Sequence, residues 1–421
     1  MERITQIIES KKVLFKNFTS LSLLQIANYV FPLITLPYLV RVLGPAKYGL
    51  VNFASAFVAY FGILTDYGFN LSATRDLSVC IKDEKKVSTI FSSVLMIKLA
   101  IYLISIFLFV AIINIFPQFQ DHPLLYIISF AGVMGSTIFP IWLFQAYEKM
   151  YFILFINVAV RTIFTISIFI MISSENDFLL FALLSSIANL VVGLTGLIFA
   201  VSRLKVKLIF PGINEIKQQV SNGWNLFLST LWINLYTTSN IFILGLFARP
   251  DIVGYFAAAD KIRMAFQGIL SPVTQSVFPY VNKLLSESYD KFVNFNKKLL
   301  RITSLTGLLI STFLFVFAST ISDLILGHEY QRSILILKII AWLPFIIIIS
   351  NVLGIQTMIP LKKQKIFSTI LFAAAVINIL ISLFLVPAYF EIGTSISLLI
   401  TEIFVSSAFY IFVKKNNIKV I

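Results

Sequence analysis

Residues 88–115 read STIFSSVLMIKLAIYLISIFLFVAIINI, and this stretch decides the fold class. It carries one charged side chain, Lys98, and contains neither proline nor glycine. An apolar stretch of about 20 residues spans a bilayer as an α-helix. The stretch therefore predicts a membrane-spanning helix with a cation inside it.

Apolar stretches of this kind recur along the whole chain. Of its 421 residues, 58% are hydrophobic and 12% are charged, and the mean hydropathy is +0.93. Soluble domains carry about 25% charged residues, so the bilayer must be part of the solvent. The pattern predicts an all-α integral membrane protein with about twelve transmembrane helices. They are expected at residues 17–40, 47–66, 88–115, 123–146, 151–173, 177–201, 221–247, 251–282, 300–325, 331–358, 365–387 and 391–413.

A polar connection in the middle of the sequence, residues 203–220, divides the predicted helices into two sets of six. The expected domains are an N-terminal lobe at residues 1–202 and a C-terminal lobe at residues 221–421. Residues 203–220 are expected to form a cytoplasmic connecting loop.

A short repeat supports two halves. Pro45-Ala-Lys-Tyr-Gly49 and Pro250-Asp-Ile-Val-Gly254 each precede an Ala-rich helix start, and the two motifs lie 205 residues apart. Because an even number of predicted helices separates them, the halves are expected to share one orientation in the membrane.

Lysine and arginine are distributed unevenly between the predicted connections. Of the 33 basic residues, 24 lie in the N-terminal tail and the even-numbered connections, 4 lie in the odd-numbered connections and 5 lie inside helices. Basic residues of membrane proteins gather on the cytoplasmic side. The distribution predicts a multi-pass protein with both termini in the cytoplasm. It also explains the net charge of +14 without nucleic acid.

The residues that build catalytic or metal centres are scarce. Cys80 is the only cysteine, so the chain can form neither an internal disulfide nor a cysteine metal site. The sequence contains no Gly-rich phosphate loop ending in Gly-Lys-Ser/Thr and no His/Glu zinc pattern. We expect no metal, no cofactor and no enzymatic activity.

Two cations lie deep inside predicted helices, where a charge costs about 2.5–3.5 kcal/mol on insertion scales. Lys98 and Arg161 each lie about ten residues into their helix. Lys98 has an alternative role, because its long side chain can extend to the membrane interface. Arg161 has no acidic residue within one helical turn, so we expect it to face a water-filled cavity. Its planar guanidinium group suits a phosphate.

The helix predicted at residues 251–282 carries a polar stripe, which is expected to face a cavity or another part of the protein. At about 100° per residue, an arc of roughly 80° holds five polar side chains. These are Asp260, Arg263, Gln267, Ser271 and Thr274. Lys261 adds a further cation beside the stripe. Alternatively, Asp260 and Arg263, three residues apart, neutralise each other.

The charged and polar positions inside helices define a candidate substrate site. The expected cavity residues are Arg161, Arg263, Lys98, Lys261, Asn28, Gln25, Asn157, Gln267 and Asn234. Two acids, Asp260 and Glu402, are candidates for ion coupling, and Glu402 can alternatively pair with a cation of another helix. Polar side chains in helices also bond to neighbouring helices without touching a substrate.

The most distinctive sequence lies near the N-terminus. Residues 23–75 read LLQIANYVFPLITLPYLVRVLGPAKYGLVNFASAFVAYFGILTDYGFNLSATR. Within them, residues 36–38, 41–45 and 66–75 (LPY, RVLGP and DYGFNLSATR) resemble the N-terminal region of Wzx-type O-antigen and capsule-unit flippases. Residues 142–149, 254–262 and 354–360 are similar to later segments of the same family.

This resemblance implies membership of the multidrug/oligosaccharidyl-lipid/polysaccharide (MOP) exporter superfamily. It implies a MATE-like V-shaped bundle of two six-helix lobes, whose central cavity opens to each side of the membrane in turn. The implied substrate is an undecaprenyl-pyrophosphate-linked repeat unit of an O-antigen or capsule, and contact with the polysaccharide polymerase machinery is expected. Some relatives that use ion gradients have acidic residues in the C-terminal lobe. Here the corresponding helices carry Asn234, Asn240 and Asn378.

Two other functions compete with a flippase. A drug or cation antiporter of the same superfamily would need an anionic cavity, whereas five of the charges inside the predicted helices are cations. A polysaccharide polymerase or ligase would need a sizeable outer loop, but the longest outer connections are only about ten residues long.

Overall fold

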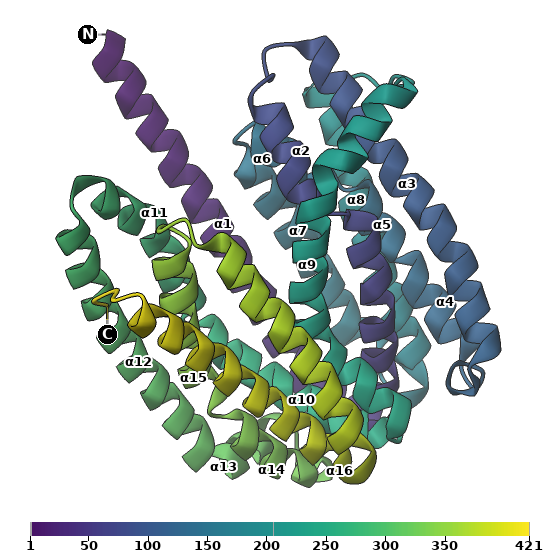
Figure 1. The fold of residues 1–421 in the computed structure, drawn as a ribbon. Helices are drawn as coiled ribbons and strands as arrows, with labels where there is room; N and C mark the ends of the chain where they lie inside the picture. The colour runs from purple at the N-terminus through teal and green to yellow at the C-terminus, as the bar shows by residue number, and fades with distance from the viewer. Residues whose placement is uncertain (1, 205, 421) are drawn as a thin grey trace. The chain divides into compact units, whose positions relative to one another are not determined.

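The computed structural model describes the backbone of residues 2–204 and 206–420. Some side chains are not described, and Ser271 of the predicted polar stripe is among them. They belong to residues 1–18, 21, 205, 225, 229, 233, 236, 237, 271–273, 275, 276 and 421. Within the described residues the regular structure is helical and contains no strand (Figure 1). The prediction of an all-α protein is confirmed.

The first part of the chain forms nine α-helices and two short 3-10 helices. They are α1 (Glu2–Asp66), α2 (Phe69–Ser78), α3 (Glu84–Ile115), η1 (Pro117–Phe119), α4 (Pro123–Ala131), α5 (Val133–Ile138), α6 (Ile141–Ala146), α7 (Met150–Met171), η2 (Glu175–Asp177), α8 (Phe178–Arg203) and α9 (Ile213–Phe247). Among them, α8 packs against α4, α5 and α7, and α2 packs against α6 (Figure 1).

The second part contains seven α-helices, a 3-10 helix and a π-helix. They are α10 (Pro250–Gly268), α11 (Ser271–Glu287), α12 (Tyr289–Val316), α13 (Ala318–Ile325), η3 (His328–Tyr330), α14 (Gln331–Ile340), α15 (Leu343–Asn351), the π-helix η4 (Val352–Met358) and α16 (Gln364–Lys415). The π-helix packs against α11, α12 and α16.

Two pairs of predicted helices meet at sharp kinks. The helices predicted at 17–40 and 47–66 are both within α1, which breaks at Gly44, where φ is 65°. Glycine adopts this left-handed conformation without a steric penalty. The last two predicted helices are both within α16, which breaks at Phe390, where φ is 44°.

Other predicted helices are divided into shorter pieces. The helix predicted at 123–146 is α4, α5 and α6, and the helix predicted at 331–358 is α14, α15 and η4. Proline explains two of the breaks, because it has no N–H for the helical ladder. Pro140 caps the start of α6, and Pro344 lies in the first turn of α15.

The helices are long and apolar enough for a protein that crosses the membrane several times. Among the described residues, eight segments qualify as membrane spans, and Thr238–Phe247 is a shorter apolar helix. Two of the eight, Ser22–Ser78 and Gln364–Lys415, each cover most or all of two of the predicted helices. Large apolar side chains such as Phe107 and Phe384 are exposed on helix surfaces, as lipid-facing residues are. The number twelve stays a prediction.

Two compact units divide the described chain. Unit one comprises Met1–Ala27 and Ala54–Leu231, and unit two comprises Asn28–Phe53 and Trp232–Ile421. Unit one has an apolar core around Phe91 and Trp142, and unit two has one around Phe292 and Phe409. The lobe boundary predicted at residues 203–220 stays a prediction.

Candidate functional site

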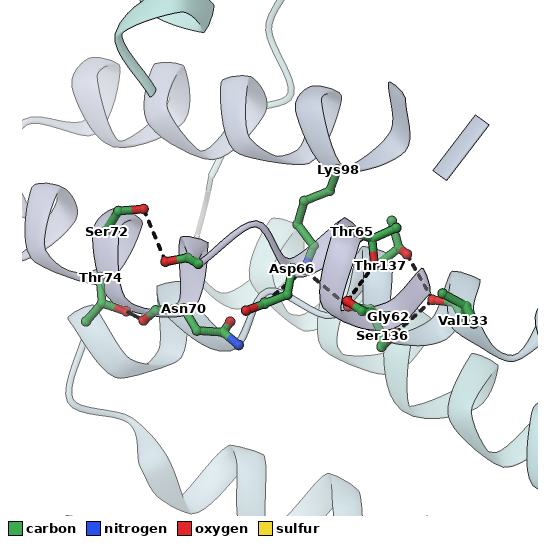
Figure 2. A network of polar contacts seen from close by, with 11 residues as sticks. Gly62, Thr65, Asp66, Asn70, Ser72, Thr74, Lys98, Val133, Ser136 and Thr137 are labelled. Atoms are coloured by element: carbon green, nitrogen blue, oxygen red, sulfur yellow. Dashed lines mark hydrogen bonds and ion pairs between the residues drawn. The ribbon is translucent and has the colours of Figure 1, made fainter. Parts of the chain in front are cut away.

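Lys98 is buried in the interior of unit one, with only 2% of its surface exposed. Its Nζ donates a hydrogen bond to the carbonyl oxygen of Ser136 at 3.3 Å and lies 4.6 Å from the centre of the Trp142 ring. Asp66 completes the surroundings, with Oδ1 at 3.8 Å from Nζ (Figure 2). The Lys98 ammonium group is thus held inside unit one.

Asp66 is the functional candidate that sequence reasoning missed. It is the last residue of α1, and the chain turns into α2 through Tyr67 and Gly68, which both have positive φ. This turn leaves the Asp66 carboxylate beside Lys98 with 23% of its side chain exposed. The signal in the sequence was weak, because Asp66 ends one helix and Lys98 lies inside another.

Hydroxyl and amide groups surround this ion pair. Thr74 of α2 donates to the carbonyl oxygen of Trp142 at 3.2 Å and to Oε1 of Gln145 at 3.1 Å, which ties α2 to α6. Figure 2 shows Asp66 and Lys98 in the middle of this network, with Asn70 and Thr74 on one side. Two buried atoms, Oδ1 of Asn70 and Nε1 of Trp142, have no hydrogen-bond partner among the described residues.

Arg161 lies in the middle of α7, a candidate membrane span. Its side chain is half-buried, and it makes no hydrogen bond or ion pair with any residue that the structure describes. Asn157 lies one turn earlier and donates Nδ2 to the carbonyl oxygen of Ile153 at 2.8 Å. Arg161 is thus a guanidinium group whose donors are available to a ligand.

Arg263 differs from Arg161, because its donors are already engaged. Its Nε donates to Oδ1 of Asp260 at 2.7 Å, its Nη2 lies 2.7 Å from the same oxygen, and its Nη1 donates to Oε1 of Gln267. Asp260 and Arg263 are both buried in unit two. Asp260 and Arg263 thus pair with each other, as the alternative interpretation of their spacing predicts. Lys261, which follows Asp260 in the sequence, is half-buried.

A network of uncharged polar groups lies beside Glu402 in unit two. Asn378 donates Nδ2 to Oγ1 of Thr401 at 3.1 Å and to Oδ1 of Asn240 at 3.4 Å, while Ser239 donates to Oδ1 of Asn378 at 3.3 Å. These bonds join α9 to the first half of α16 and the two halves of α16 to each other. Glu402 follows Thr401 directly and is buried.

The predicted site residues are divided between the two units. Lys98, Arg161, Asn157 and Gln25 belong to unit one, and the rest belong to unit two. Gln25, Asn28 and Asn234 are half-buried. Within the described part of the chain, no three His, Cys, Asp or Glu side chains are grouped to hold a metal ion.

Solved structures of two transporters share this fold. The lipid II flippase MurJ, in an inward closed conformation, matches with a TM-score of 0.75 and 16% identity, over 96% of this chain and 87% of that chain. A MATE family multidrug resistance transporter in an inward-facing conformation matches with a TM-score of 0.70 and 13% identity, over 94% of this chain and 98% of that chain. The chain therefore shares the multi-pass α-helical fold of these two proteins.

Sequence comparison narrows this class. The family described as polysaccharide biosynthesis protein matches residues 14–285. A protein of Escherichia coli (strain K12) named "Putative O-antigen transporter" is 34% identical over 411 residues, covering 98% of this chain and 99% of that protein. A protein of Shigella dysenteriae with the same name is 31% identical over 392 residues, covering 93% of this chain and 97% of that protein. The chain belongs to the polysaccharide biosynthesis protein family.

These comparisons confirm the resemblance read from the N-terminal sequence. The relatives and the solved structures are named as transporters or flippases and not as enzymes. The prediction that the chain is a transporter and not an enzyme is therefore confirmed as well.

Proposed function

We propose that this chain flips an undecaprenyl-pyrophosphate-linked repeat unit of an O-antigen or capsule from the cytoplasmic to the periplasmic leaflet. The similarity to two proteins named as O-antigen transporters extends over almost the whole chain. A lipid II flippase has the same fold. Both observations favour a lipid-linked glycan over a soluble substrate.

The chemical support for the proposal comes from Arg161. A pyrophosphate that leaves water for the bilayer loses its hydration and needs donors and positive charge in return. The free guanidinium group of Arg161 supplies both, in a fork that matches phosphate oxygens. Lys98, Lys261 and Arg263 are assigned to the lining of the proposed cavity. Lys98 and Arg263 are paired with Asp66 and Asp260, so these two pairs bring little net charge.

Amide side chains are assigned to the sugar part of the substrate. Gln25, Asn28, Asn157 and Asn234 are half-buried, so their amides can exchange hydrogen bonds with sugar hydroxyls. Gln267 already accepts a bond from Arg263 and is assigned to positioning that guanidinium group.

Movement of the substrate is assigned to alternating access between two lobes. Asp260 and Glu402 are the candidates for ion coupling, since they are buried acids in unit two. We place both termini in the cytoplasm, because 24 of 33 basic residues lie on one predicted side. We place the protein in the inner membrane of a bacterium, since both relatives named as O-antigen transporters are bacterial proteins. We also propose that the chain contacts the polysaccharide polymerase.

An antiporter of cationic drugs is the competing function. The free ionic group inside α7 is a cation, and a cation repels a cationic drug at that position. The observation at Arg161 therefore favours the anionic lipid headgroup.

The experiment is to locate the lipid-linked unit in a strain that lacks this chain. Single units should accumulate on the cytoplasmic leaflet, out of reach of a periplasmic glycan-labelling reagent, and complementation should restore labelling. Deletion of a polymerase leaves single units labelled outside and provides the control. Single units that are labelled outside in the strain without this chain would contradict the proposal.

A further inference from the structure

A second polar site lies in unit two, where the π-helix η4 crosses α11 and α12. Asn296 of α12 is 0% exposed and Gln356 of η4 is 1% exposed. The side-chain oxygens of both residues, Oδ1 and Oε1, have no hydrogen-bond partner among the described residues. Buried polar atoms nearly always have a partner, so two unpaired oxygens in one cluster need an explanation.

Hydrogen bonds fix the orientation of both amides. Asn296 donates Nδ2 to the carbonyl oxygen of Gln356 at 3.2 Å, and Gln356 donates Nε2 to the carbonyl oxygen of Thr274 at 2.7 Å. A flipped amide would place an oxygen against a carbonyl oxygen, which is repulsive. The unpaired ends are therefore oxygens, and the same bonds join the two residues in one cluster.

A third amide oxygen belongs to the same part of the chain. Oδ1 of Asn351 is a buried atom without a partner among the described residues, and it lies five residues before Gln356 at the start of the π-helix. One turn of a π-helix corresponds to its i→i+5 hydrogen bond, so these two residues lie about one turn apart. Such turns are often found at functional sites.

We propose that the side-chain oxygens of Asn296, Gln356 and Asn351 form a binding site for a small monovalent cation. All three unpaired atoms are acceptors, and within the described parts of α11, α12, α15 and η4 no side-chain donor is buried without a partner. A cation uses acceptors alone, whereas a water that donates to two of these oxygens would keep its own lone pairs without a donor. Oxygen ligands without a carboxylate suit Na⁺ or K⁺ better than a divalent ion.

The site uses none of the residues assigned to the lipid-linked substrate, so it can be tested without that substrate. The full-length protein is purified in detergent, and its Tm is followed as NaCl or KCl replaces choline chloride at constant ionic strength. Binding to the folded state raises the Tm in a saturable way. We expect a rise of a few degrees with Na⁺ or K⁺ relative to choline.

Variants identify the ligands. Asn296→Leu should abolish the rise. Asn351→Asp replaces a neutral oxygen with a charged one and breaks no hydrogen bond of the described residues. It should lower the half-saturating concentration of Na⁺ or K⁺ several-fold. This test stands even if the Asn296→Leu variant does not fold. Ser382→Ala removes a buried hydroxyl that is bonded to Ser397 and should keep the rise. No saturable rise in the wild-type protein, a rise retained in Asn296→Leu, or an unchanged concentration in Asn351→Asp would each overturn the proposal.

Discussion

Gly49 and Gly254 each pack against the helix start that contains the other. A Cβ atom added to Gly49 would overlap the carbonyl oxygen of Pro250, and one added to Gly254 would overlap the carbonyl oxygen of Pro45. These four residues are the ends of the two Pro-x3-Gly motifs. The two copies of the repeated motif thus contact each other through their backbones, within unit two.

The first prediction concerns this contact. Gly49→Ala and Gly254→Ala should each destabilise the protein by about 1–3 kcal/mol, the usual range for overpacking. The atoms that a new methyl group would meet are backbone atoms, which move less easily than a side-chain end. Thermal unfolding of the purified protein measures the effect.

Gly62→Ala is the matched control, because a Cβ at that position in α1 would meet nothing within 4 Å. It should leave stability unchanged or raise it slightly through helix propensity. Equal stabilities for Gly49→Ala and Gly62→Ala would show that the close approach at Gly49 is absent.

The second prediction concerns the ion pair of unit one. Asp66→Asn should lower the free energy of unfolding by about 2 kcal/mol, because it leaves the Lys98 ammonium group buried without its counterion. Loss of one partner from a fully buried pair costs about 3–5 kcal/mol, and the partial exposure of Asp66 reduces this cost. Denaturation in detergent provides the measurement.

A double-mutant cycle separates the pair from its surroundings. Lys98→Met removes the buried ammonium group and leaves Asp66, whose carboxylate is partly exposed, so it should cost less stability than Asp66→Asn. Adding Asp66→Asn to Lys98→Met should then have little further effect. If Asp66→Asn costs the same in both backgrounds, the two residues do not interact.

The third prediction concerns pH and the start of α3. Asp83 caps this helix, and the hydrogen bond from the backbone N–H of Lys86 holds the pKa of the Asp83 carboxyl below its ordinary value of 3.8. A carboxyl group whose pKa is lowered in the folded state stabilises that state at pH values above its ordinary pKa. This stabilisation is lost as the pH falls through the lowered pKa. The first turn of α3 should therefore loosen below about pH 4.

Hydrogen exchange at residues 84–88 tests this prediction against Asp83→Asn. Asparagine is also a good N-cap but does not titrate. Wild-type protein and variant should be protected alike at neutral pH, and only the wild type should lose protection on acidification. A parallel loss in both would exclude Asp83 as the cause.

The sequence predicts some parts of this molecule well for physical reasons. Apolar runs identify the helices, because lipid leaves few other options for the backbone. Asp260 and Arg263 were recognisable as a pair because they lie three residues apart on one helix. The break between the helices predicted at residues 17–40 and 47–66 was expected, and it lies at Gly44.

Other features depend on packing between distant segments and were not predicted. Asp66 pairs with Lys98 across two helices, and no periodicity links them. The π-helix and the orientation of Gln356 depend on contacts with α11 and α12. A break after residue 387 was expected, but the residue that adopts the positive φ is Phe390, which is not a residue type that marks turns.

Substrate recognition by Arg161 is the central claim and is best tested by reconstitution. Purified protein is placed in liposomes with a fluorescent pyrophosphate-linked oligosaccharide on a polyprenyl chain, and the fraction that a membrane-impermeant quencher reaches is followed over time. Wild-type protein should flip the lipid, Arg161→Lys should retain part of the rate, and Arg161→Ala should lose at least about tenfold. Arg249→Ala, which changes an exposed arginine paired with Asp251, should flip at the wild-type rate. Flipping by Arg161→Ala at the wild-type rate would contradict the account.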